Sequence, residues 1–331
     1  MATYKGIQGY TVQKLSSDPT AAEAVGQLFY NSTSGAFKIG TQGVGAWSAG
    51  GNLNDNRDEM ASCGTQNAAL AAGGEPPNTS NAETYDGTTW TEVNNLVSGG
   101  RYGLVGFGTT TAAIAAGGYS NPPTSARSDV ESWNGTSWTE TTNMTTGRYN
   151  FGGSKGGTQT AGIVFSGISP SHGTETSNTE EWNGSTWTEK NNVLTARAAA
   201  KGLGTSTASL MCGGGTSSLT VKVAIVEEWD GTSWTEVGNL NVARQNVGSA
   251  GTTAAGLVAG GNGPSFSALT EKWDGTSWTE VADISTGRYG PGSSGSQAEA
   301  AIFGGSTATA AVASTEEWND PVYALKTVTV S

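Results

Sequence analysis

The sequence predicts an all-β fold built from one four-stranded sheet repeated along the chain. Of the 331 residues, 50 are glycine, only 13% are charged and 35% are hydrophobic. This composition is typical of many short strands joined by tight turns. Glycine and β-branched threonine disfavour helix interiors, and no long segment carries an apolar period of 3.6 residues. The octet WNGTSWTE at 133–140 recurs with small changes, which indicates an internal repeat.

Each repeat carries the same residue types at the same spacing. The first aromatic residues of the repeats lie 44 to 49 residues apart, at Tyr85, Trp133, Trp182, Trp229, Trp273 and Trp318. A Glu lies two residues before each of them, at Glu83, Glu131, Glu180, Glu227, Glu271 and Glu316. A second Trp lies five residues after the first five, at Trp90, Trp138, Trp187, Trp234 and Trp278. An Arg follows ten or eleven residues later, at Arg101, Arg148, Arg197, Arg244 and Arg288. We call these recurrent residues the repeat frame.

The frame predicts four strands in each repeat. One follows the Arg, one ends in a Gly-Gly pair such as Gly117-Gly118, one ends in Glu-x-Trp, and one starts at the second Trp. The DGTS or NGTS between the aromatic residues supplies the positive φ that a tight hairpin needs. We expect the frame Arg and Glu to pair within a repeat, and the Trp side chains to form core between repeats. Cys63 and Cys212 show no disulfide or metal pattern and are expected to be buried hydrophobic residues.

The sixth repeat lacks its fourth strand, and the N-terminal part of the chain supplies a candidate for it. After Trp318 the sequence reads NDPVYALKT, without a second Trp. Trp47 precedes Arg57 by ten residues, which is the spacing between Trp138 and Arg148, so Arg57 is counted as the sixth Arg of the repeat frame. We therefore expect the strand at Trp47 to complete the sixth sheet, because closure removes an unpaired sheet edge.

The order of features in each repeat resembles the kelch repeat. That repeat likewise has an Arg, a strand ending in Gly-Gly, an aromatic residue preceded by an acidic one, and a Trp in its last strand. The resemblance covers residues 47–320. It implies that the repeats are the blades of a six-bladed, kelch-like β-propeller closed by an N-terminal strand.

Residues 1–46 fall outside the predicted propeller, and residues 321–331 are expected to form a C-terminal strand or tail. GQLFYNSTSGAFKI at 26–39 predicts a small separate β-hairpin. With MATYKGIQGYTVQKL before it, this segment resembles the N-terminal attachment regions of tail-fibre and other virion proteins of marine bacteriophages. The resemblance implies that residues 1–46 bind other virion proteins. No apolar signal-peptide segment occurs in residues 1–30, so we expect assembly in the host cytoplasm and release in the virion by lysis.

Charge and residue types exclude several classes of function. The net charge of −12 disfavours nucleic acid and anionic membrane surfaces as partners. No stretch approaches the roughly 20 apolar residues of a membrane helix, so no membrane insertion is expected. The only histidine, His172, excludes a histidine-rich metal site and disfavours a Ser-His-Asp triad. We expect no cofactor and no metal. A glycosidase needs two carboxylates across the scissile bond, and Asp129, Glu175 and Asp283 show no such pairing in sequence.

We expect a non-enzymatic, virion-associated propeller of a bacteriophage that serves as a structural or host-recognition module, in a tail fibre or as surface decoration. A homo-oligomer is compatible with the sequence. The alternative is a secreted or virion glycan-degrading hydrolase or lyase. An enzyme should show unpaired acidic residues at one mouth of the channel, whereas a binding module should show variable loops on a uniform scaffold.

The loops between second and third strands vary most in length and content, while the DGTS turns hardly change. Rigid folds carry binding sites on such loops. The candidate ligand-binding residues are Tyr119, Arg127, His172 and Phe266, which lie outside the frame and are expected to be exposed. Their expected partner is a host surface glycan or protein.

Overall fold

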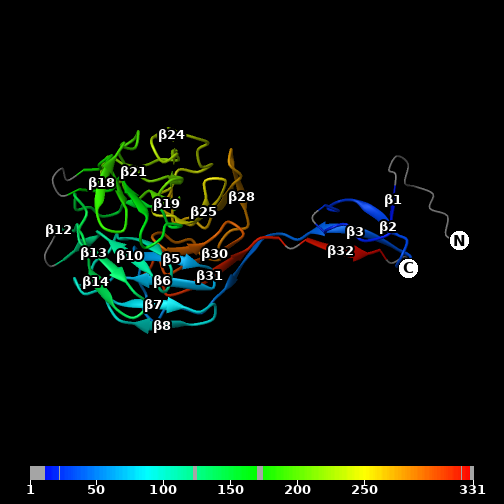
Figure 1. Ribbon diagram of the computed structural model, residues 1–331, viewed down its shortest axis with the longest axis horizontal. Coiled ribbons are helices and arrows are strands. Elements are labelled where there is room, and N and C mark those ends of the chain that lie inside the picture. Colours follow the sequence, from blue (N-terminus) through cyan, green and yellow to red (C-terminus); the bar gives the residue numbers. More distant parts are fainter. Residues whose placement is uncertain (1–11, 22, 122–124, 170–173, 322, 329–331) are drawn as a thin grey trace. The chain divides into compact units, whose positions relative to one another are not determined.

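The computed structural model describes residues 12–21, 23–121, 125–169, 174–321 and 323–328. The chain divides into two compact units, one of residues 47–319 and one of residues 1–46 with 320–331. The described part is made of strands and turns (Figure 1). Within it, no helix is long and apolar enough to cross a membrane. The predicted all-β class is confirmed.

The larger unit contains six four-stranded sheets (Figure 1). The first consists of β5 (Ala61–Thr65), β6 (Ala68–Ala72), β7 (Ala82–Tyr85) and β8 (Trp90–Val93). The second consists of β9 (Val105–Gly108), β10 (Ala113–Ala116), β13 (Val130–Trp133) and β14 (Trp138–Glu140). The third consists of β15 (Gly152–Gly153), β16 (Gly162–Phe165), β17 (Thr179–Trp182) and β18 (Trp187–Lys190).

The remaining three sheets follow the same order. The fourth consists of β19 (Lys201–Gly204), β20 (Ser209–Cys212), β23 (Val226–Trp229) and β24 (Trp234–Glu236). The fifth consists of β25 (Gly248–Thr252), β26 (Ala255–Ala259), β27 (Thr270–Trp273) and β28 (Trp278–Val281). The sixth consists of β29 (Gly292–Gly295), β30 (Glu299–Phe303), β31 (Thr315–Asn319) and β4 (Ala46–Ala49). Two short hairpins lie in loops: β11 (Tyr119–Ser120) with β12 (Ser125–Ala126), and β21 (Gly215–Thr216) with β22 (Val221–Lys222).

The repeated octet is the hairpin between the third and fourth strands, as the sequence predicts. In the fourth sheet Trp229 pairs with Trp234 across this hairpin. Asp230 Oδ1 accepts the backbone N–H groups of Thr232 and Ser233, both at 2.8 Å, while Gly231 has a φ of +93°. Asp or Asn followed by Gly therefore supplies both the cap and the left-handed residue of the turn.

The sixth sheet takes its fourth strand, β4, from the N-terminal part of the chain, so the prediction made from Trp47 is confirmed. The ring of Trp47 packs on Trp318 with centroids 5.6 Å apart. Its Nε1 donates to Thr270 Oγ1 in the fifth sheet at 3.1 Å. Trp47 is half-buried, whereas the other ten Trp side chains are buried.

The first strands of the six sheets form a closed circle, because β5, β9, β15, β19, β25 and β29 contact one another in that order and β29 contacts β5. A ring of backbone hydrogen bonds lies just before these strands. We call its six residues the neck ring: Glu59, Gly103, Asn150, Ala199, Asn246 and Gly290. Each has a φ between 49° and 65°. Each N–H donates to the carbonyl of the ring residue in the preceding sheet, at 2.6 to 3.0 Å, and Glu59 donates to Gly290.

The core lies between neighbouring sheets. Trp133 and Trp138 of the second sheet pack against Cys63 and Leu70 of the first. Cys63 and Cys212 are buried free thiols, as expected, and burial raises the pKa of both to about 12. The frame Trp residues thus serve as core between repeats.

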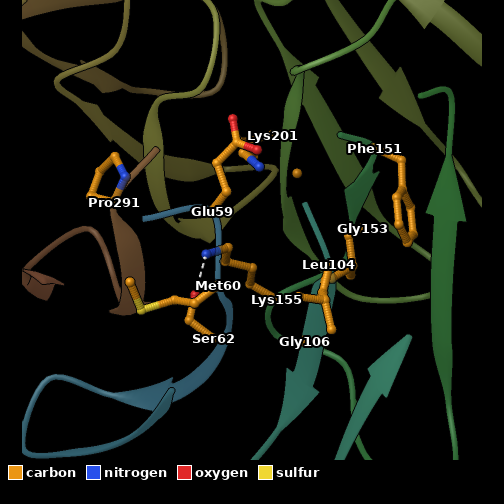
Figure 2. A pocket seen from close by; sticks show the side chains of 12 residues that line it. Glu59, Met60, Ser62, Leu104, Gly106, Phe151, Gly153, Lys155, Lys201 and Pro291 are labelled. Carbon is orange, nitrogen blue, oxygen red and sulfur yellow. Dashed lines mark hydrogen bonds between the residues drawn. The ribbon is translucent and has the colours of Figure 1, made fainter. Parts of the chain in front are cut away.

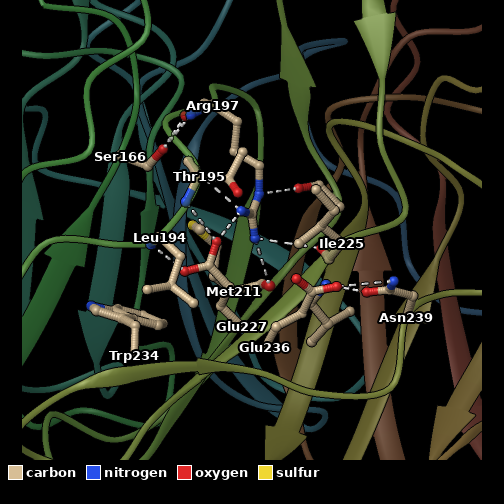
Figure 3. A network of polar contacts seen from close by, with 12 residues as sticks. Ser166, Leu194, Thr195, Arg197, Met211, Ile225, Glu227, Trp234, Glu236 and Asn239 are labelled. Carbon is tan, nitrogen blue, oxygen red and sulfur yellow. Dashed lines mark hydrogen bonds and ion pairs between the residues drawn. The ribbon is translucent and has the colours of Figure 1, made fainter.

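Every sheet also contains a buried ion pair between its frame Arg and Glu. The six pairs are Arg57–Glu83, Arg101–Glu131, Arg148–Glu180, Arg197–Glu227, Arg244–Glu271 and Arg288–Glu316. Figure 3 shows one of them, in which Arg197 binds Glu227. Arg197 also donates from Nε to the Gly213 carbonyl at 2.8 Å. Glu227 Oε2 also accepts the Leu194 N–H at 2.6 Å. The pairing predicted within each repeat is confirmed.

The smaller unit is one sheet in the order β1 (Gln13–Leu15), β2 (Leu28–Asn31), β3 (Ala36–Gln42) and β32 (Tyr323–Thr327). Strands β2 and β3 form the expected hairpin, and Asn31 Oδ1 caps its turn by accepting the N–H groups of Thr33 and Ser34. The hairpin is not separate, however. It is extended by β1 on one side and by C-terminal β32 on the other, because its edges otherwise leave backbone groups unpaired.

Candidate functional site

Two further sets of residues surround the neck ring on one face of the larger unit. The inner set directly follows each frame Arg: Asp58, Tyr102, Tyr149, Ala198, Gln245 and Tyr289. The outer set directly follows each Gly-Gly position: Glu75, Tyr119, Ile168, Gly215, Asn262 and Ser306. Within each sheet, the inner residue forms an isolated antiparallel bridge with the outer one. We call these twelve residues and the neck ring together the mouth.

Aromatic side chains cover two parts of the mouth. The ring of Tyr119 lies between those of Tyr102 and Tyr149, with centroid distances of 5.6 and 4.9 Å. Phe266, from the loop after the fifth sheet's second strand, stacks on Tyr289 at 5.2 Å with an interplanar angle of 14°. These rings offer apolar faces beside polar groups.

Three carboxyl groups of the first sheet lie at the mouth without an ion pair among the described residues. Asp58 Oδ2 accepts a hydrogen bond from Ser306 Oγ, and burial raises the pKa of Asp58 to about 6. Glu59 Oε1 accepts from Asn246 Nδ2 at 2.7 Å, and burial raises its pKa to about 7. The pKa of Glu75 is raised to about 7 by burial and by the charge of Asp58. Each group therefore titrates close to neutral pH.

Five buried oxygen atoms of the mouth have no hydrogen-bond partner in the part of the chain that the structure describes. They are Asp58 Oδ1, Glu59 Oε2, Asn150 Oδ1, Gln245 Oε1 and Asn246 Oδ1. The five side chains are only 2 to 8% exposed. They come from the first, third and fifth sheets, so they alternate around the ring. Buried polar groups are nearly always paired, so this concentration of free acceptors sets the mouth apart from the rest of the ring.

Two lysines, Lys155 and Lys201, lie near Glu59 of the neck ring (Figure 2). With Glu59 they line a cavity of about 20 Å³, which has room for water but not for a larger ligand. Lys155 Nζ donates to Ser62 Oγ at 2.8 Å and to Ser293 Oγ at 2.7 Å. Burial lowers the pKa of Lys155 to about 7, and burial also lowers the pKa of Lys201. The space around the two lysines is therefore too small for an organic ligand, and Lys155 is already held by its own hydrogen bonds.

The structure brings two of the sequence-predicted candidates to the mouth, Tyr119 and Phe266. Arg127 lies in the neighbouring loop, where it binds Asp129 and donates to Ser120 Oγ at 3.3 Å. These three side chains are half-buried rather than exposed, because each packs on or binds a neighbour. His172 lies outside the described residues.

The acidic residues of the mouth are not the ones that the sequence singled out. Asp129 binds Arg127, Glu175 accepts the Leu219 N–H at 3.2 Å, and Asp283 accepts a backbone N–H at 3.2 Å. The mouth carboxyls instead follow the frame Arg and the Gly-Gly position. A signal for them exists in the two residues after each Arg, which vary as DE, YG, YN, AA, QN and YG inside an otherwise constant frame.

No family model and no curated protein matches the chain. Among 282 solved chains that resemble it, the structure of YjhT superposes with a TM-score of 0.70 over 82% of this chain and 99% of its own. The sequence identity is 13%, so the likeness shows a shared fold alone.

Proposed function

We propose that the larger unit is a six-bladed, kelch-like β-propeller that recognises a host surface glycan at its mouth without cleaving it. Six four-stranded sheets, the closed neck ring and the fold shared with YjhT support the architecture.

One observation carries the binding role. At one face of a uniform ring, the residues that differ from repeat to repeat place aromatic rings beside buried oxygens that lack partners. Sugar-binding sites combine these two features, since aromatic faces stack on sugar rings while polar groups orient the hydroxyls.

We further propose that the protein belongs to a bacteriophage virion, in a tail fibre or as surface decoration. The support is the resemblance of GQLFYNSTSG and its flanks to phage attachment regions. The compact sheet that both chain ends form is a unit of its own, suited to bind other virion proteins while the mouth binds the host. Mass spectrometry of purified particles tests this role, and absence of the protein from them would contradict it.

A glycan-degrading hydrolase or lyase is the second candidate, favoured by a specific observation. General acids and bases work best with pKa values near the operating pH. The mouth holds Asp58, Glu59 and Glu75 with pKa values raised toward neutrality and without ion pairs among the described residues.

One experiment separates the candidates. The full chain is screened on an array of bacterial surface glycans, and each bound glycan is then incubated with it and analysed by mass spectrometry. A recognition module retains intact glycan, whereas an enzyme releases shorter products. The double variant Tyr119→Ala/Tyr289→Ala should lose retention, while Thr276→Ala in an exposed DGTS turn should keep it. Retention by the double variant with an unchanged fold would overturn the assignment of the mouth.

A further inference from the structure

We propose that the mouth selects a ligand bearing a primary ammonium group, such as an unacetylated amino sugar. This inference rests on the proposed recognition function and adds the chemical class of its ligand.

The unpartnered groups of the mouth are all hydrogen-bond acceptors. Asp58, Glu59, Asn150, Gln245 and Asn246 each contribute one oxygen that is buried and has no donor among the described residues. Glu59, Asn150 and Asn246 belong to the neck ring, and Asn246 Nδ2 already donates to Glu59 Oε1 at 2.7 Å. Asp58 reaches the outer set, where it accepts from Ser306 Oγ. A complementary ligand must supply hydrogen-bond donors rather than acceptors. A primary ammonium group carries three donors and no acceptor, whereas a hydroxyl carries one donor.

The charges around these oxygens favour a cation. Asp58, Glu59 and Glu75 provide three carboxyl groups, and Lys201 is the cation whose charge acts on Asp58 and Glu59. Lys155 lines the same cavity as Lys201 and Glu59, so three carboxyl groups stand against two buried lysines. A bound ammonium group favours the ionised form of each carboxyl, so a cationic ligand gains relative to an acidic sugar.

The walls of the mouth suit an organic cation. Tyr102, Tyr119 and Tyr149 pack in series, and Tyr289 stacks with Phe266. The faces of aromatic rings attract ammonium groups and stack on sugar rings. A bare metal ion fits less well, because the described residues contain no group of three or more His, Cys, Asp or Glu side chains placed to hold one.

The test compares matched ligands by calorimetry with the full chain at about pH 6, where the sugar amine is mostly protonated. The ligands are the glucosamine tetramer, the N-acetylglucosamine tetramer and the neutral glucose tetramer. We expect the glucosamine tetramer to bind at least about tenfold more tightly than the other two. Equal affinity for the three would overturn the ammonium inference and leave the glycan-binding function standing. Binding of none of them would count against the glycan-binding function.

The same chemistry could come from a protein, so a second pair of ligands is included. Lysine methyl ester blocked at its α-amine is compared with its Nε-acetylated form. Preference for the free amine among these, without binding of the glucosamine tetramer, would keep the ammonium inference and overturn the glycan as its source.

Matched variants locate the site. Glu75→Gln removes a charge from a half-buried mouth residue and should weaken binding of the glucosamine tetramer about tenfold, since a charged partner is lost. Glu140→Gln removes the same charge from an exposed residue of β14 and should leave affinity unchanged. Melting curves establish that both variants are folded. Unchanged affinity in folded Glu75→Gln, or an equal loss in Glu140→Gln, would contradict this placement.

Discussion

The repeat frame, which we call the scaffold, and the mouth both contain buried glutamates. The frame glutamates form ion pairs, whereas Glu59 of the mouth has none among the described residues. Each frame Glu receives an Arg and a backbone N–H, as Glu227 does from Arg197 and Leu194. In the mouth Glu59 receives one amide hydrogen bond, and its second oxygen has no partner in the described chain. A buried carboxyl is stable only when its hydrogen bonds and charge are satisfied. The frame carboxylates are therefore paired within their own sheets, whereas the mouth carboxyls keep oxygens that no described residue pairs; the unpartnered atoms of the frame are instead nitrogens, such as Arg57 Nε and Trp318 Nε1.

This contrast follows the repeat pattern. The paired residues recur in all six sheets, so each sheet satisfies its own buried charges. The unpartnered oxygens occur in alternate sheets and at positions that vary. Residues that break a local rule inside a consistent fold are expected at functional sites, where the rest of the structure offsets their cost.

The largest expected effect is the removal of a scaffold charge. Arg197→Ala should lower the free energy of unfolding by about 3–5 kcal/mol, because it leaves Glu227 buried and unpaired. Urea denaturation of the purified chain measures this loss. A loss of unfolding free energy below about 1 kcal/mol would show that the buried Arg–Glu pairs of the frame contribute no more than exposed ion pairs do.

The loss of the Trp side chain of the fourth strand should cost more stability in the first five sheets than in the sixth sheet, which β4 completes. Trp138→Ala should cost roughly 3–5 kcal/mol, because Trp138 is 4% exposed and packs against the first sheet. Trp47→Ala should cost about 1–2 kcal/mol, because Trp47 is half-buried. The two variants are compared in the same denaturation experiment. Equal losses would mean that Trp47 in the sixth sheet is packed as tightly as the Trp residues of the other sheets.

The sequence predicted the scaffold well because its signals are local and repeated. Arg, Gly-Gly and Glu-x-Trp recur at fixed spacing, and Trp47 could be assigned to the sixth sheet from its distance to Arg57. The partner of the N-terminal hairpin was missed. Strand β32 carries no frame residue, and pairing between the two chain ends leaves no periodic trace.

The mouth was predicted only in part. Tyr119 and Phe266 stand in variable loops, which predicts them as candidates, whereas no variable loop marks Asp58 and Glu59, which directly follow the frame residue Arg57. The proximity of Glu59 to Asn246 comes from ring closure, which joins these residues across 187 positions. No spacing rule along the chain reveals that contact.

The pH dependence of stability should differ between wild type and a mouth variant. The pKa of Glu59 rises from its ordinary 4.5 to about 7, so the folded chain holds this proton more tightly than the unfolded chain. Its contribution to stability is therefore full below about pH 4.5 and is lost as the pH rises through 7. Glu59→Gln should remove that loss. Between about pH 4.5 and pH 7, the unfolding free energy of the wild type should therefore fall by about 1–3 kcal/mol more than that of the variant.

Charged and titratable groups facing Glu59 set the control for this measurement. They include Asp58, Glu75 and Lys201. The charge of Glu59 also helps to raise the pKa of Tyr102 and of Tyr149. Burial lowers the pKa of Lys201, so burying this lysine costs stability at low pH. That cost disappears as the pH rises toward 10.5, which is opposite to the pH dependence expected from Glu59. Glu140→Gln on the exposed surface should follow the wild-type curve. Parallel curves for wild type and Glu59→Gln would show that Glu59 is not strained by burial.

The smallest expected effect concerns Arg127, the one charged candidate that the sequence proposed and the structure describes. Its pair with Asp129 has both side chains 23% exposed, and partly exposed pairs contribute about 0–1 kcal/mol. Arg127→Ala should therefore lower the unfolding free energy by less than about 1 kcal/mol, and binding of the glucosamine tetramer should hardly change, since the guanidinium is already held by Asp129 and Ser120. Calorimetry and denaturation of this variant are run beside Glu75→Gln. A stronger loss of binding in Arg127→Ala than in Glu75→Gln would move recognition from the acidic mouth to the variable loop.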